Sequence, residues 1–352
     1  MSFLNTTEVA FGLDISDRSL RLIQLEKKVK KISVQSYNEI KLPEDCISSG
    51  EIRQPKVFLN SLDKLIKTKQ GHGKLSDEVI SVLPENKTFF KIVNIPLVPD
   101  EEIDKKIKEI LPQDIPVDLN DIYMDQQIIN KSDNGLEILV GVSPKNIIES
   151  YVDVLTKANL IPTVLEIESA PISRLLVEND NGDKPKVIID IGANRTGLFL
   201  YDKTVRFTVS LPISGNKITK HIVDTLEMNW NEAEKAKKVC GLDKNKCHGA
   251  LREIFSGVIS ELQDRITKSI TFYYNTFPDA KEIGEIIICG GGANFIDIAS
   301  ALSEKIQIPI TISDPWKNLD NPNKKYFTTS RSQSFITAIG LGLRGLKPET
   351  FL

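Results

Sequence analysis

The strongest hydrophobic pattern in the chain covers residues 186–201. An apolar run rich in β-branched side chains leads into Asp-Ile-Gly-Ala-Asn-Arg-Thr-Gly at residues 190–197, and a second apolar run follows over residues 198–201. Two apolar runs around a segment rich in glycine, asparagine and threonine are typical of two strands joined by a tight turn. Residues 186–201 are therefore predicted to form a hairpin with an aspartate at the end of its first strand.

Residues 9–25 repeat this plan near the N-terminus. Three positions correspond between the two segments: Asp14 with Asp190, Ser16 with Gly192, and Ser19 with Arg195. An internal duplication explains two such hairpins better than two unrelated turns do. The duplication predicts two halves that face one ligand from opposite sides.

Apolar periodicity predicts the other elements of an α/β protein. Helical periodicity covers residues 55–69, 102–111, 145–158, 170–177, 218–226, 232–239, 249–277, 296–306 and 334–344. Alternating or continuous apolar runs predict strands over residues 31–42, 79–83, 88–95, 122–129, 136–142, 162–167, 205–211, 283–289 and 309–312. We expect residues 214–216 to cap the helix that begins near residue 218, and Asn231 to cap the next one.

A chain of 352 residues is long enough for two lobes, each with its own core. A small strand–helix–strand–strand subdomain is predicted to interrupt the first lobe, and its strands offer an edge for a partner peptide. A polar cluster at residues 180–185 marks the boundary between the lobes. The predicted parts are the first-lobe core (1–83 and 144–185), the inserted subdomain (84–143), the second lobe (186–330) with a helical subdomain around 215–250, and an interdomain helix returning to the first lobe (331–352).

Composition and charge narrow the range of functions. The formal net charge is −3 and 26% of the residues are charged, which argues against nucleic acid as the main partner because nucleic-acid binding needs a strongly basic surface. No apolar run approaches the length of a membrane span, and residues 1–5 do not resemble a signal peptide. We therefore expect a cytoplasmic protein.

The four cysteines, Cys46, Cys240, Cys247 and Cys289, include no Cys-x-x-Cys pair. Cys240, Cys247 and His248 are close in sequence, but zinc would need a fourth ligand and tighter spacing. In a reducing compartment the four cysteines are expected to be free thiols.

The predicted hairpin turns carry chemistry that suits a phosphorylated ligand. Clustered backbone N–H groups can cradle a phosphate, and the aspartate at the strand end can hold a divalent metal ion through water. A third segment, Gly-Gly-Gly at residues 290–292, follows the apolar strand at residues 283–289, and three glycines let a flat ring lie directly on the backbone. The sequence has no Walker A motif and no Gly-x-Gly-x-x-Gly spacing.

Four motifs resemble those of the actin-like ATPase superfamily and, within it, the PilM family of type IV pilus assembly proteins, which is related to FtsA. Residues 11–16 are similar to the first phosphate motif, residues 187–193 to the second, residues 288–293 to the adenosine motif, and residues 338–345 to the interdomain helix. The resemblance covers nearly the whole chain. It implies an α/β, actin-like fold of two duplicated ribonuclease H-like lobes, with an inserted α+β subdomain in the first.

The inserted segment favours the PilM family over its relatives. Residues 90–96 and 111–116 resemble the PilM pattern of a strand ending in proline and a helix exit broken by prolines. Actin, the heat-shock chaperones and sugar kinases have no insertion of that type there. FtsA usually adds a C-terminal amphipathic membrane helix, whereas this sequence stops at residues 348–352 after the interdomain helix.

The resemblance implies a site for ATP and Mg²⁺. Asp14 and Asp190 would orient the metal ion through waters or act in catalysis, and Glu168 would activate water. The residues expected to contact the nucleotide are Ser16, Ser19, Arg21, Gly192, Asn194, Thr196, Glu234, Lys237, Gly290, Gly291, Gly292 and Asn294.

Two departures from the family pattern bear on activity. Ser16 and Arg21 stand where glycine and lysine are common, so phosphate contact at the first turn is expected to be looser. The segment 166–174, which includes Glu168, matches the first interdomain helix of the family less closely. ATP binding with slow or negligible hydrolysis is therefore expected.

The resemblance also implies partners. The N-terminal cytoplasmic tail of a PilN-like membrane protein would bind beside the inserted subdomain and hold the protein at the inner face of the cytoplasmic membrane. Other platform and motor proteins of a pilus or related type II secretion machine, and self-association, are further expected contacts. Two alternatives stay open: an FtsA-like division filament, and a small-molecule kinase that uses Asp118, Asp121 or Asp125.

Overall fold

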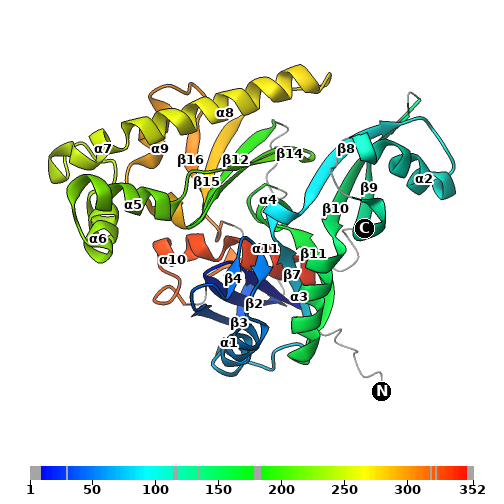
Figure 1. Cartoon of the computed structure of the whole chain (residues 1–352), viewed down its shortest axis with the longest axis horizontal. Helices are drawn as coiled ribbons and strands as arrows, with labels where there is room; N and C mark the ends of the chain where they lie inside the picture. Colours follow the sequence, from blue (N-terminus) through cyan, green and yellow to red (C-terminus); the bar gives the residue numbers. More distant parts are fainter. Residues whose placement is uncertain are drawn as a thin grey trace. The chain divides into compact units, whose positions relative to one another are not determined.

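The computed structural model describes residues 9–28, 31–113, 118–133, 135–177, 184–317, 319–321 and 323–346 (Figure 1). The chain divides into two compact units: unit 1 is Met1–Leu175, Asn318–Pro322 and Thr337–Leu352, and unit 2 is Leu176–Lys317 and Asn323–Ile336. The expectations for residues 1–5, 114–116, 180–183 and 348–352 lie outside the described residues. None of the helices in the described part combines the length and apolar character that crossing a membrane requires.

Unit 1 is built on a mixed sheet with β1 near its centre. Its strands are β1 (Phe11–Ile15), β2 (Ser19–Lys28), β3 (Lys31–Lys41), β6 (Gln70–Gly71), β7 (Glu78–Leu83), β11 (Ile161–Ile167) and β17 (Leu319–Asp320). The order is β11-β7-β1-β2-β3-β17, and β6 also pairs with β3. β1, β2 and β3 are antiparallel neighbours, whereas β1, β7 and β11 run parallel. The carboxyl ends of β1, β7 and β11 therefore lie at one edge of the sheet.

Different helices cover the two faces of this sheet. Phe11 of β1 belongs to a buried core with Phe58 of α1 (Pro55–Lys67) and Tyr151 of α3 (Lys145–Lys157). The next residue, Gly12, faces the opposite way, and a Cβ there would lie 2.5 Å from the backbone of Ala338 in α11 (Ile336–Gly345). Because strand side chains alternate between faces, Asp14 shares the α11 face with Gly12. The short strands β4 (Ile47–Ser48) and β5 (Glu51–Ile52) pair separately, and α4 (Ser169–Leu176) follows β11.

A smaller sheet within unit 1 has its own core. β8 (Phe89–Ile95), β9 (Ile122–Ser132) and β10 (Gly135–Pro144) are antiparallel in the order β8-β10-β9, and α2 (Asp100–Ile110) packs on one face. Ile138 of β10 is fully buried with Ile107 of α2. These elements occur in the order that the periodicity predicts.

Unit 2 has a sheet of the same connectivity. Its strands are β12 (Lys186–Ile191), β13 (Thr196–Asp202), β14 (Thr204–Leu211), β15 (Glu285–Cys289) and β16 (Ile310–Ile312). The order β14-β13-β12-β15-β16 reproduces β3-β2-β1-β7-β11 of unit 1, with antiparallel and parallel pairings in the same places. This correspondence confirms the predicted fold of two duplicated α/β lobes.

Helices α5 to α10 belong to unit 2. Their bounds are α5 (Gly215–Leu226), α6 (Trp230–Cys240), α7 (Ala250–Ile254), α8 (Ser256–Thr276), α9 (Ile298–Ser303) and α10 (Thr329–Ser334). The apolar side chains of β12 and β13 on one face join residues of α5, α8 and α9 in a single buried core. Ser214 caps α5 as predicted, because its side chain accepts a hydrogen bond from Lys217 N.

Three helix predictions in unit 2 are corrected. The long helix expected over residues 249–277 is two helices, because the chain breaks at Phe255 and buries that ring against Phe295, with centroids 5.6 Å apart. The cap of α6 is Asn229 rather than Asn231, since Asn229 and Glu232 form a capping box. The helix expected over residues 296–306 is the shorter α9, which starts after Asp297 in the left-handed conformation.

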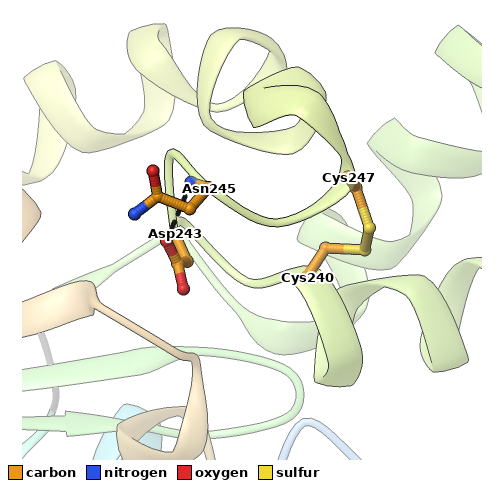
Figure 2. Close-up of a disulfide and its surroundings, with 4 residues drawn as sticks. All are labelled: Cys240, Asp243, Asn245 and Cys247. Carbon is orange, nitrogen blue, oxygen red and sulfur yellow. Dashed lines mark hydrogen bonds between the residues drawn. A yellow bond between two sulfur atoms is a disulfide. The ribbon is translucent and has the colours of Figure 1, made fainter.

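The expectation of four free thiols is wrong for Cys240 and Cys247, which form a disulfide with their Cα atoms 5.7 Å apart (Figure 2). The chain returns to the end of α6 because three successive residues, 247–249, adopt positive φ. Neither the spacing of the cysteines nor the composition of the segment between them indicates that the chain returns to the end of α6. Cys46 and Cys289 are thiols, as expected, and both are buried.

Candidate functional site

The two predicted hairpin turns close in the same way. In unit 1 the backbone N–H of Ser16 donates to Ser19 O at 3.1 Å, and in unit 2 that of Gly192 donates to Arg195 O at 2.9 Å. The positions paired from sequence are therefore structurally equivalent. Each turn follows a strand that carries an aspartate at its end, so the duplication extends from the strand order to the backbone of the turn.

The serine side chains of the first turn form hydrogen bonds within the turn. Ser16 Oγ donates to Ser19 O at 3.0 Å and lies 3.1 Å from Ser19 Oγ. These bonds give the turn a fixed shape with the serine that replaces the usual glycine.

Charged side chains surround Asp14. Arg21 lies opposite Asp14 in the β1–β2 register, and it donates through Nη1 to Asp14 Oδ2 at 3.0 Å and through Nε to Glu39 Oε1 at 2.8 Å. Burial raises the pKa of Asp14 from its usual 3.8 to about 6; Arg21 opposes the rise and the charge of Glu168 adds to it. The structure thus brings Asp14, Arg21 and Glu168 together within unit 1.

Substitution Asp14→Asn should change how stability depends on pH. Because the pKa of Asp14 is higher in the folded state, its favourable contribution is complete below 3.8 and is lost as the pH rises through about 6. Relative to D14N, the wild-type free energy of unfolding should therefore fall by about 3 kcal/mol between acidic and neutral pH. Urea denaturation of both proteins across this range measures the difference, and parallel pH profiles would contradict it.

Glycines bring the end of β15 against Asp190 in unit 2. A Cβ on Gly290, whose φ is +77°, would lie 2.0 Å from Asp190 Oδ1, and one on Gly292 would lie 2.1 Å from Ile191 Cγ2. A Cβ on Gly291 would have no atom within 4 Å. The fold therefore explains the first and third glycines, and the open position at Gly291 fits a ligand that approaches the backbone.

The N-terminus of α5 is attached to the second turn. Gly215 N donates to Gly192 O at 3.0 Å and Asn216 N to Ala193 O at 2.9 Å, while Asn216 Nδ2 donates to Asn194 Oδ1 at 2.6 Å. The positive end of a helix dipole thus lies beside the turn, which favours an anionic group there. The sequence pattern predicts only a helix cap at this segment, so the contact of Asn216 with the turn adds this residue to the candidates.

Glu234 and Lys237 connect α6 to the first turn of α5. Lys237 Nζ donates to Gly215 O at 3.0 Å, to Thr219 Oγ1 at 2.7 Å and to Glu234. Burial alone would raise the pKa of Glu234, but hydrogen bonds from Lys237 and Thr219 outweigh it and lower that pKa. These bonds fix α6 against α5, whose N-terminus is bonded to the second turn. The expected contact of Glu234 and Lys237 with a nucleoside stays a prediction.

Asn294 and Thr196 were also predicted to contact the nucleotide, and the structure shows the contacts around each side chain. Asn294 donates through Nδ2 to Gly291 O at 3.1 Å and to Ser330 O at 3.0 Å, which fastens the short 3₁₀ helix Gly291–Asn294 to α10. Thr196, at the start of β13, is fully buried, and within the described residues its Oγ1 has no hydrogen-bond partner. An unsatisfied buried hydroxyl costs stability, so this one is consistent with a ligand or metal-bound water at the turn.

The three aspartates considered for a kinase are exposed in the smaller sheet region of unit 1. Asp118 accepts a hydrogen bond from Asn120 N, and Asp125 from Gln126 N. These are local turn and strand contacts. They give no support to a catalytic aspartate there.

Two duplicated sheets, each with an aspartate at the end of the strand before its turn, define an actin-like fold. Residues 12–346 match the family model described as type IV pilus assembly protein PilM. The chain belongs to this family.

Solved structures agree on the fold. A PilM-PilN type IV pilus biogenesis complex has a TM-score of 0.81 at 19% identity, covering 97% of this chain and 99% of that chain. The ethanolamine utilization protein EutJ from Carboxydothermus hydrogenoformans has a TM-score of 0.56 at 13% identity, covering 95% and 89%. MreB5 of Spiroplasma citri bound to ADP has a TM-score of 0.54 at 12% identity, covering 96% of each chain.

Proposed function

We propose that the protein binds ATP with Mg²⁺ and serves as a cytoplasmic scaffold in type IV pilus assembly. The observation that carries the proposal is the pair of equivalent turns, each closed by the same backbone hydrogen bond and each preceded by an aspartate. Family membership supports the pilus role, and the similar fold of an ADP-bound protein supports the nucleotide.

The chain offers suitable groups for each part of the ligand. Backbone N–H groups of the two turns and the α5 N-terminus would bind the phosphates. Asp14 and Asp190 would hold Mg²⁺ through waters, and the metal ion would neutralise phosphate charge. Glu234 and Lys237 would reach the ribose and base, while the open backbone at Gly291 would support the adenine.

Hydrolysis is expected to be slow. Asp14 is paired with Arg21 at 3.0 Å, and the same arginine is shared with Glu39. Asp14 would have to give up its contact with Arg21 before it could accept a proton from water, and Glu168 would have to act beside it. A steady-state assay that finds rapid phosphate release from the purified protein would overturn this expectation.

Substitution Thr196→Val tests the nucleotide site with little risk to the fold, because Thr196 Oγ1 has no partner to lose. At a concentration one hundred times the dissociation constant, Mg-ATP should stabilise the nucleotide-free wild type by about 2.7 kcal/mol. A tenfold weaker site in T196V would reduce this to about 1.4 kcal/mol. Thermal unfolding measures both values, with T271V on the exposed side of α8 as control.

Two results of that experiment would be decisive. No stabilisation of the wild type by millimolar Mg-ATP would overturn nucleotide binding. Equal stabilisation of the wild type and T196V would remove Thr196 from the site while leaving the binding proposal intact.

The proposed partner is the N-terminal tail of a PilN-like membrane protein. The fold shared with a PilM-PilN type IV pilus biogenesis complex supports this choice, and the smaller sheet of unit 1 offers a surface. Its face opposite α2 carries half-buried apolar side chains such as Ile92 and Leu139, which are paired in register. Through this tail the protein would be held at the inner face of the membrane, and platform or motor proteins and further copies of the chain would join it there.

Fluorescence anisotropy with the labelled tail peptide tests this contact. Gly141→Arg places a long charged side chain on the proposed face, where a Cβ has its nearest atom 4.0 Å away, so the sheet should tolerate it. We expect saturable binding to the wild type and about tenfold weaker binding to G141R. Binding of a scrambled peptide with the same affinity would overturn the proposal.

A further inference from the structure

The disulfide of unit 2 joins the last residue of α6 to a surface turn (Figure 2). Cys240 is buried, whereas Cys247 is exposed and opens the short 3₁₀ segment Cys247–Gly249. A dissolved thiol can therefore reach the sulfur of Cys247 and not that of Cys240. Accessible disulfides of this kind are the ones that exchange with thiols, and in reducing compartments they are often regulatory.

The segment that the disulfide closes is anchored at one end by Leu242, which is buried and donates through its N–H to Ile296 O at 2.8 Å. Beyond Leu242 it is held by local bonds and by the exposed contact between Lys244 and Glu304. Asn245 N donates to Asp243 Oδ1 at 2.9 Å, as Figure 2 shows, and Lys246 N donates to Asp243 O at 3.1 Å. Cys247 and His248 have φ of +49° and +54°, a conformation that side-chain-bearing residues rarely adopt. The disulfide holds these residues in place, so its loss would let the turn relax.

On the Cys240 side, hydrogen bonds connect the disulfide-bonded end of α6 to the candidate nucleotide site. Lys237 lies one helical turn before Cys240 and donates to Gly215 O at 3.0 Å. Gly215 N in turn donates to Gly192 O at 3.0 Å in the second phosphate-binding turn. The last turn of α6 thus carries both the disulfide and the side chain that fixes the α5 N-terminus.

We propose that Cys240–Cys247 is a redox switch that controls nucleotide affinity by positioning the last turn of α6. This inference rests on the proposed nucleotide-binding function. The oxidised form holds Lys237 on the α5 N-terminus and binds Mg-ATP more tightly. In the reduced form the end of α6 loosens, and the second phosphate-binding turn loses that support.

The reductant is a dithiol. Its thiolate attacks Cys247 Sγ, the protein S–S bond breaks, and Cys240 leaves as a thiolate that takes up a proton. The second thiol of the reductant then displaces Cys247, which also becomes a free thiol. The reductant ends as a disulfide, and the protein has gained two electrons and two protons.

The test uses the full chain, oxidised or treated with dithiothreitol, and three measurements. Alkylation and mass spectrometry report the thiol state, limited trypsin cleavage after Lys244 and Lys246 reports the turn, and titration with Mg-ATP reports affinity. Both lysines are exposed within the turn. On reduction we expect faster cleavage at these two sites and about tenfold weaker Mg-ATP binding, the factor that one charge-assisted hydrogen bond contributes. Reoxidation should restore both.

Variants separate the possible outcomes. C240S/C247S should resemble the reduced protein whatever the reagent, and C46S should respond to dithiothreitol like the wild type. Equal Mg-ATP affinity in both states would overturn the switch alone, as would alkylation of Cys240 and Cys247 in the oxidised sample. Absence of Mg-ATP binding in both states would overturn the proposed function, and the switch with it.

Discussion

Substitution Gly290→Ala is expected to destabilise unit 2 and to abolish the response to Mg-ATP. The φ of +77° at Gly290 disfavours any side chain, and the new Cβ would lie 2.0 Å from Asp190 Oδ1 and 3.0 Å from Ile191 O. The side chain of Asp190 must rotate away, while the backbone oxygen cannot. The left-handed conformation and the overpacking together should cost about 2–5 kcal/mol in free energy of unfolding.

The neighbouring glycine provides a matched control. Gly291→Ala introduces the same methyl group where no atom lies within 4 Å, so its effect on stability should stay within about 0.5 kcal/mol. If a ring lies on this backbone, G291A should still weaken Mg-ATP binding. Urea denaturation and thermal unfolding with Mg-ATP measure both effects, and equal stability of G290A and G291A would contradict the explanation.

The hairpins could be predicted because their information is local. Runs of β-branched residues set the strands, and the residues between Asp190 and Thr196 set a turn that closes from Gly192 to Arg195. The same positions in the first hairpin are related by a constant offset, so the sequence alone revealed the equivalence. The strand order, which is the same in both sheets, comes from the structure and not from the sequence.

Contacts between distant residues could not be predicted. The contact between Arg21 and Glu39 depends on the β2–β3 register, which places the two residues opposite each other. The expected contact of Arg21 with phosphate stays a prediction. The break at Phe255 depends on burial against Phe295, and the disulfide depends on a turn with positive φ at Cys247. All of these contacts join residues that are distant in sequence or held by a particular backbone turn. The periodicity of hydrophobic residues along the chain does not encode which such residues meet.

The structure also shows one difference between the two duplicated hairpins. Asp14 lies opposite Arg21 in its hairpin, whereas the equivalent position opposite Asp190 is Gly197. The first aspartate thus has a guanidinium in contact and the second has a glycine across the strand pair.

Substitution Arg174→Met is expected to destabilise unit 1 by about 3–5 kcal/mol, since it leaves a buried carboxylate without its main partner. Arg174 of α4 donates to both oxygens of Glu166 at 2.6 and 3.0 Å, and to Gly340 O of α11 at 3.0 Å. Arg174 and Glu166 are 5% and 6% exposed, so water screens the pair weakly. Arg344 also contacts Glu166, which favours the lower end of the range.

Chemical denaturation of R174M and two comparison proteins measures this effect. Lys157→Met removes an exposed partner of Asp153 and should change the free energy of unfolding by less than about 0.5 kcal/mol. Arg174→Lys keeps the charge but cannot make the two-pronged contact, so it should fall between them. A loss below about 1 kcal/mol in R174M would mean that Arg344 alone satisfies Glu166. A large loss would show that the α4–α11 contact depends on the buried arginine, because Arg174 is the side chain that joins β11 to both helices.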